Sequence, residues 1–131
     1  MAHESPDNGV ANALGRIYIR DLTTRCIIGI NPDERENTQD VVINIVLMAD
    51  LRPAAQSDRI EDAVDYKGVK KKVLALVEGS SFFMIERMAD RIAARCLEDV
   101  RIQQATVTVD KPGALRYARS VAVEVTRTRE A

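Results

Sequence analysis

The sequence predicts one α+β domain in which two strands, two helices and two further strands follow one another. Three observations support this fold class. β-Branched residues predominate at both ends of the chain, and two apolar stripes with helical spacing lie between them. The 131 residues are enough for one domain with its own core and too few for two. We therefore expect a four-stranded antiparallel sheet with both helices packed on one face.

The first half of the sheet comes from two strands joined by a polar loop. The first strand is expected from Arg16 to Ile30, bent near residues 21–23, and turn residues from Asn31 onward predict the loop. The second strand, from Asp40 to Leu51, has two alternating sets of side chains that are both largely apolar. We expect it to be covered on both faces, by the helices on one and by another copy of the chain on the other.

After that strand we expect a connection at residues 52–63, which contain Pro53. A helix is then expected from Tyr66, with Asp65 as its N-cap and Gly79 at its end. One face of this helix is an apolar stripe, formed by Val69, Val73, Leu76 and Val77. Lysines 70–72 lie largely outside the stripe, so they are interpreted as a solvated face rather than a nucleic-acid patch.

The second helix is expected from Phe82 to Glu98, with Ser80 or Ser81 as its cap. Its apolar stripe consists of Ile85, Met88, Ala89, Ile92, Cys96 and Leu97. Two strands follow, at residues 104–110 and 117–126. The turn between them gathers charged residues around Pro112 and Gly113, and such a cluster at a strand end favours a binding site. The alternative, an ordinary solvated hairpin tip, stays open.

Composition excludes several function classes. A net charge of −1, 4% aromatic residues and no Trp argue against a nucleic-acid binder. No apolar run is long enough for a membrane helix. Residues 1–14 are expected to be a flexible tail without the features of a secretion signal, and residues 15–131 to be the domain. Cys26 and Cys96 are far apart in sequence and fit buried thiols in a reducing cytoplasm.

Metal and histidine chemistry are disfavoured by the residue inventory. The chain has one His, His3 in the tail, and two isolated cysteines, so a zinc site and a Ser-His-Asp arrangement are not expected. A glycine-rich phosphate loop is also missing. We therefore expect no metal and no cofactor, and catalysis by Lys, Tyr and carboxylate groups.

Lys111, at a strand end, is the first candidate for such chemistry. Glu86 in the second helix could be partly buried, although an exposed glutamate paired with a neighbouring arginine is the simpler interpretation. Tyr66 could equally be a half-buried boundary residue. Glu34 and Gln39 lie in the polar loop, where simple solvation is the alternative.

Several motifs in the right order resemble those of the dihydroneopterin aldolase family, over about Arg16 to Arg127. The matching segments are Ile28-Gly29-Ile30, Glu34-Arg35-Glu36 with Gln39, Val64-Asp65-Tyr66, residues 85–93 (IERMADRIA) and Val109-Asp110-Lys111-Pro112. The resemblance implies the tunnelling fold (ββααββ). It also implies a homo-octamer of two stacked tetrameric rings, with active sites between neighbouring subunits.

Within the family, the segment after Lys111 separates two branches. Aldolases typically have Ala-Ile-Pro before the final strand, whereas this chain has Ala114-Leu115-Arg116-Tyr117-Ala118. That segment, with Asp110 before Lys111, resembles the dihydroneopterin triphosphate 2′-epimerase branch, whereas Pro112 resembles the aldolases. We expect an epimerase, with an aldolase as the alternative and a non-catalytic ring-forming binding protein as a third possibility.

The resemblance also implies a role for each motif. Glu86, with backbone groups near Ile85, would bind the polar edge of the pterin, to which Val64 and Asp65 would also contribute. Lys111 would be the general acid and base, assisted by Tyr66 from a neighbouring subunit. Glu34 and Gln39 would position the substrate side chain and a water molecule. Arg116 and Arg119 would hold the triphosphate.

Overall fold

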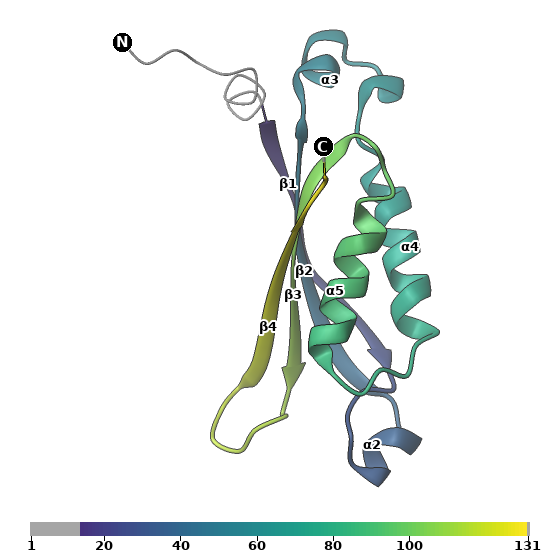
Figure 1. Ribbon diagram of the computed structural model, residues 1–131, viewed down its shortest axis with the longest axis vertical. Helices are drawn as coiled ribbons and strands as arrows, with labels where there is room; N and C mark the ends of the chain where they lie inside the picture. Colours follow the sequence, from purple (N-terminus) through teal and green to yellow (C-terminus); the bar gives the residue numbers. More distant parts are fainter. Residues whose placement is uncertain (1–13, 131) are drawn as a thin grey trace.

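A computed structural model describes residues 14–130, and its order of elements confirms the predicted ββααββ arrangement (Figure 1). The principal elements are β1 (Leu14–Cys26), β2 (Gln39–Asp50), α4 (Tyr66–Glu78), α5 (Ile85–Cys96), β3 (Ile102–Pro112) and β4 (Ser120–Thr128). Three short helices lie in the connections, namely α2 (Pro32–Glu36), α3 (Arg52–Ser57) and the 3₁₀-helix η1 (Ile60–Asp62). The expected tail lies outside the described residues except for Leu14, which begins β1.

The four strands form one antiparallel sheet in the order β1-β2-β3-β4. The predicted bend in the first strand is confirmed, because the register with β2 shifts between Ile19 and Leu22. Asp21 adopts a φ of 54° there, and its backbone N–H donates to Asn44 Oδ1 at 2.9 Å. The strand ends at Cys26, four residues earlier than expected.

Both long helices cover one face of the sheet, and the core lies between these two layers (Figure 1). The alternation in β2 explains this, since every second side chain from Val41 to Ala49 is fully buried. The predicted helix stripes pack against them, with Val69, Val73 and Val77 from α4 and Ile85, Met88, Ala89, Ile92 and Cys96 from α5. Both cysteines are free and buried, as expected.

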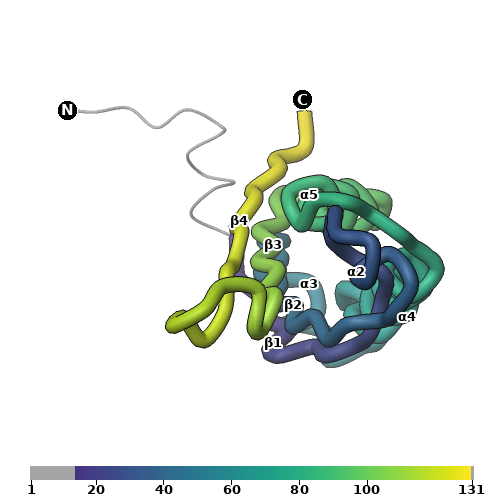
Figure 2. Tube along the Cα trace, turned by 90° about the horizontal axis from the view of Figure 1, so that it is seen from below, coloured from purple at the N-terminus to yellow at the C-terminus, as the bar shows by residue number. Residues whose placement is uncertain are grey.

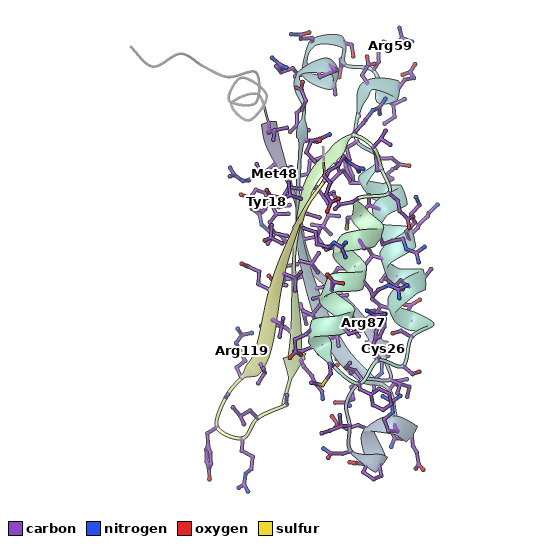
Figure 3. The ribbon with its side chains drawn as sticks, viewed as in Figure 1. Tyr18, Cys26, Met48, Arg59, Arg87 and Arg119 are labelled. Atoms are coloured by element: carbon purple, nitrogen blue, oxygen red, sulfur yellow. The ribbon has the colours of Figure 1, made fainter. Side chains whose placement is uncertain are left out.

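The other face of the sheet is only partly covered within one chain. Val42, Val46 and Met48 are half-buried, and Tyr18 is 51% exposed. Figure 3 shows Tyr18 and Met48 on the side of the sheet away from the helices. Covering of this face by another copy stays a prediction.

Asp65 caps α4 as predicted, since its Oδ1 accepts the backbone N–H of Gly68 at 2.9 Å. Gly79 ends the helix, and lysines 70–72 are exposed. The connection between β2 and α4 contains α3 and η1, and the predicted loop before β2 contains α2. Within residues 14–130, no helix is long and apolar enough to cross a membrane.

The predicted start of the second helix is wrong. Helix α5 begins at Ile85 rather than Phe82, and its N-cap is Met84. Ser80 does not cap it, because the Ser80 hydroxyl donates to the Val77 carbonyl at the end of α4. Strand β4 also begins later than expected, at Ser120, and Tyr117, with a left-handed φ of 67°, lies in the turn before it.

Candidate active site

The end of β3, the short helix α2 and the start of α5 meet at one end of the molecule, which we call the lower end (Figure 1). Here Lys111 Nζ lies 2.5 Å from Glu34 Oε2. The two side chains are 14% and 17% exposed, so most of their surface is removed from water. This geometry joins two residues that are 77 positions apart in the chain and that the sequence had marked as candidates.

Glu34 is held by two further hydrogen bonds. Its Oε1 accepts the backbone N–H of Asn31 at 3.1 Å, and its Oε2 accepts Gln39 Nε2 at 3.2 Å. The same amide group of Gln39 donates to the Ile28 carbonyl at 2.8 Å. The hydrogen bond from Lys111 and then that from Asn31 lower the pKa of Glu34 from 4.5 to about 2. The site therefore contains a fixed carboxylate beside an ammonium group.

Gly29 makes room for that carboxylate. Its φ of +124° is one that side chains rarely adopt, and a Cβ at this position would lie 2.3 Å from Glu34 Cδ. Glycine is therefore required here both by the backbone conformation and by the close approach of the carboxylate.

A cleft of about 270 Å³ opens beside the ion pair, and Lys111 and Glu86 both line it. Its remaining lining is mostly apolar: Ile28, Gly29, Ile30, Glu34, Phe83, Met84, Ile85, Ala114, Val121 and Val123. Glu86 is exposed in the single chain, rather than partly buried. Between residues 14 and 130, Glu86 forms no ion pair, so the pairing suggested with Arg87 or Arg91 is not found. Its carboxylate is available to a ligand.

Sequence reasoning missed the part played by Arg35. Its guanidinium donates to three backbone carbonyls, those of Gly29, Ser81 and Phe82, and lies 4.0 Å from the centre of the Phe83 ring. Phe83, Met84 and Ala114 were also not singled out, although each lines the cleft. The motif Glu34-Arg35-Glu36 was the only signal, and it does not reveal which distant backbone the arginine binds.

Tyr66, Val64 and Asp65 lie at the other end of the molecule, the upper end, where α3 and η1 are found (Figure 1). Arg101, just before β3, donates to the carbonyls of Glu61 and Ala63 and so fixes this segment beside the start of β3. Lys111 is nine residues from Ile102 along the same strand, or about 30 Å. One chain therefore does not bring these three residues to the cleft.

Arg116 and Arg119 lie in the loop between β3 and β4, which projects from the sheet away from the helices (Figure 2). Both are exposed, and Arg119 points away from the helix layer in Figure 3. The Arg116 guanidinium lies 5.5 Å from the Tyr117 ring centre. Neither arginine lines the cleft, but Ala114 of the same loop does, so the loop continues one wall of the cleft.

The arrangement can bind a flat polar ring and transfer a proton beside it. The cleft offers apolar walls, one unpaired carboxylate for N–H donors and one lysine held by a second carboxylate. In the described part of the chain, no cluster of three or more His, Cys, Asp or Glu residues could hold a metal ion.

Comparison of the sequence with known proteins gives matches over nearly all of the described chain. A family model described as FolB, dihydroneopterin aldolase, matches residues 17–126. Dihydroneopterin triphosphate 2′-epimerase of Pseudomonas aeruginosa is 37% identical over 110 residues, which are 84% of this chain and 89% of the relative. Dihydroneopterin aldolase of Streptomyces coelicolor is 39% identical over 101 residues, 77% of this chain and 85% of the relative.

Solved structures agree with these matches. Escherichia coli dihydroneopterin aldolase in complex with neopterin has a TM-score of 0.82 and 30% identity, covering 86% of this chain and 98% of that one. A Burkholderia dihydroneopterin aldolase bound to guanine has a TM-score of 0.79 and 28% identity, covering 91% and 94%. The chain is thus similar to proteins named for two related activities.

Proposed function

Because the chain belongs to the dihydroneopterin aldolase (FolB) family, we propose that it is an enzyme of the epimerase branch that inverts C2′ of 7,8-dihydroneopterin triphosphate. The product would be 7,8-dihydromonapterin triphosphate. The observation that carries the proposal is that Lys111 and Glu86 line one cleft, with Glu34 bonded to the lysine. Proton transfer to or from a bound ring requires the transferring group and the ring-binding group to line the same cleft, as Lys111 and Glu86 do.

Glu86 is the group that recognises the ring in this proposal. Pterins and guanine share an amino group next to a ring N–H, two donors that face the same way. A single carboxylate accepts both in a charge-assisted pair. The neopterin and guanine complexes of the similar structures support this reading, since both ligands present that edge. Backbone groups near Ile85 would complete the contacts.

Lys111 acts at the other end of the ring. Its ammonium form gives a proton to N5 of the ring, and the amine that results takes the proton of the 2′-hydroxyl through a water molecule held by Glu34 and Gln39. The C1′–C2′ bond then breaks, its electrons enter the C=N bond of the dihydropterin, and C2′ becomes an aldehyde carbon. No Schiff base is needed because the ring itself accepts the electrons. Re-addition of C1′ to the opposite face of the aldehyde inverts C2′.

Retention of the cleaved fragment separates an epimerase from an aldolase. In the triphosphate substrate the aldehyde fragment carries the phosphates, and arginine side chains can hold it while its face turns. Arg116 and Arg119 fill this role in the proposal, because their loop continues the wall at Ala114. If Arg116→Ala left the preference for the triphosphate over dihydroneopterin unchanged, the phosphate-binding role proposed for Arg116 would be wrong.

The substrate site is completed by a second copy. We propose a homo-octamer of stacked tetrameric rings in which Val64, Asp65 and Tyr66 of one copy approach the lower end of the next. The separation of these residues from Lys111 within one chain supports this. Tyr66, 53% exposed in the single chain, would assist proton transfer. A monomer in light scattering at micromolar concentration would contradict the assembly.

Product analysis decides the reaction. The protein is incubated with 7,8-dihydroneopterin triphosphate, and the mixture is dephosphorylated, oxidised and separated. Monapterin is the expected product. 6-Hydroxymethylpterin alone would establish the alternative, an aldolase that releases glycolaldehyde, which the similarity to the Streptomyces coelicolor enzyme favours. Recovery of neopterin alone would indicate a non-catalytic binding protein.

A further inference from the structure

We propose that Arg35 is a positioning residue that holds the proton-transfer side of the cleft and its ring-binding side at a fixed separation. The inference rests on the proposed function, because it assigns those two sides from it. Arg35 itself does not line the cleft.

The two sides belong to different segments of the chain. Glu34 and Gly29 lie on the segment between β1 and β2, whereas Phe83 and Glu86 lie on the segment that enters α5. The one backbone hydrogen bond between these segments is from Gly29 N to the Phe82 carbonyl, at 3.3 Å. A single long bond is a weak link between two walls that must keep a constant distance.

Arg35 supplies the remaining links. Its Nη1 donates to the carbonyls of Gly29 and Phe82, both at 3.0 Å, and its Nη2 donates to the Ser81 carbonyl at 2.6 Å. One rigid guanidinium thus bridges both segments, with charge-assisted bonds to neutral carbonyls. The side chain follows Glu34 directly in sequence, so the same turn carries the catalytic carboxylate and the bridge.

Phe83 extends the bridge to the cleft wall. The Arg35 guanidinium lies 4.0 Å from its ring centre, within range of a cation–π contact. The ring is 60% exposed and lines the cleft, so stacking on Arg35 fixes the orientation of a side chain that would otherwise rotate. Two residues beyond Met84, Glu86 lies in the first turn of α5. The position of the ring-binding carboxylate therefore depends on the segment that Arg35 holds.

Arg129 offers a matched control. Its guanidinium also donates to three backbone carbonyls, those of Leu97 and Asp99 in the turn after α5 and that of Ile102 at the start of β3. Arg129→Ala removes the same kind of contact at a distance from the cleft. A general loss of stability will affect both variants, whereas a positioning role will affect only Arg35.

The experiment compares Arg35→Ala, Arg35→Lys and Arg129→Ala in neopterin binding by titration calorimetry and in amide hydrogen exchange. We expect the neopterin Kd to rise about tenfold or more in Arg35→Ala, because three charge-assisted bonds are lost. Arg35→Lys, which keeps the charge but carries its donors on a single nitrogen, should show a smaller rise, and Arg129→Ala should stay within about twofold. Exchange of the Gly29 N–H, which donates to the Phe82 carbonyl, should accelerate only in the Arg35 variants.

Equal Kd values and equal exchange of the Gly29 N–H for Arg35→Ala and Arg129→Ala would overturn the inference. Phe83→Leu tests the contact between Arg35 and the Phe83 ring. An unchanged neopterin Kd in that variant would contradict a contribution of this stacking to binding. If the unmodified protein failed to bind neopterin, the proposed function would be wrong, whereas the exchange comparison would still confirm or overturn the bridge.

Discussion

The lower and upper ends of the sheet both contain a hollow lined by charged residues, yet of the two only the lower one is lined by a lysine. The upper hollow, about 360 Å³ and lined by Leu14, Asp50, Pro53, Asp62, Arg101 and Gln103, is the larger. Its charged groups are occupied with the fold itself, since Arg101 binds two backbone carbonyls and Asp50 pairs with Arg52 at 2.8 Å. At the lower end, Lys111 and Glu86 both face the cleft.

The two ends differ in the side chains that they present, and each lacks a group that the other has. The cleft at the lower end is lined by a lysine and carboxylates but by no tyrosine, whereas the upper end presents the exposed Tyr66 and its hollow is lined by no lysine. Each end is therefore half of the proposed site. A head-to-tail ring, in which the upper end of one copy meets the lower end of the next, would join the halves.

Removal of the lysine should give the largest effect at the lower end. Lys111→Met is expected to lower kcat by about 10²–10⁴-fold, because the group that transfers the proton is lost. Neopterin affinity should change little, since Glu86 remains. Steady-state kinetics and calorimetry check both values, with the exposed Lys71→Met as the control. Near-normal turnover in Lys111→Met would show that the chemistry lies elsewhere.

Two glycines with positive φ differ in what an added side chain would contact. Gly29 and Gly113 both have positive φ, +124° and +72°, but only a Cβ at Gly29 would meet Glu34, whereas nothing lies within 4 Å at Gly113. Gly113→Ala should cost about 1–2 kcal/mol of stability through backbone strain alone. Gly29→Ala should cost more and should also lower kcat, because the carboxylate must move.

Urea unfolding midpoints and initial rates for the two alanine variants measure these effects. Equal losses of stability with equal rates would mean that the contact between Gly29 and Glu34 has no role in positioning the ion pair.

The smallest expected effect is the pH dependence of the Glu34–Lys111 ion pair. The pKa of Glu34 is about 2 in the folded protein, below the ordinary 4.5. The ion pair therefore stabilises the fold above pH 4.5, and this stabilisation is lost as the pH falls toward 2. The difference in unfolding free energy between the unmodified protein and Glu34→Gln should be constant above about pH 5 and shrink below it. A difference that does not change between pH 5 and pH 2 would contradict the assigned pKa.

Local patterns predicted the fold, whereas the residues of the candidate site were marked by the family resemblance. Alternation in β2 and the helical stripes determine the two layers, because burial follows side-chain periodicity directly. Family resemblance marked Lys111, Glu34, Gln39 and Glu86, and the fold brings these four to the lower end. The structure has the tunnelling fold that the resemblance implied.

The errors arose where distant backbone groups decide the local structure. The sequence pattern predicts a helix from Phe82 with Ser80 or Ser81 as its cap, but Arg35 binds the carbonyls of Ser81 and Phe82 and that segment is not helical. No periodicity in either segment reveals this contact. Tyr117 was placed in a strand by the pattern after it, although its left-handed backbone belongs to the turn. Both cases depend on contacts or geometry that a one-dimensional pattern does not contain.

Mixing two inactive variants tests most directly whether the ends of different copies form one site. Lys111→Met and Tyr66→Phe are each prepared alone, then unfolded together in equal amounts and refolded. A shared site would restore about a quarter of the unmodified activity, since that fraction of random neighbours supplies one intact lysine and one intact tyrosine. Activity that stays at the sum of the two separate variants, with mixed oligomers present by native mass spectrometry, would contradict the account.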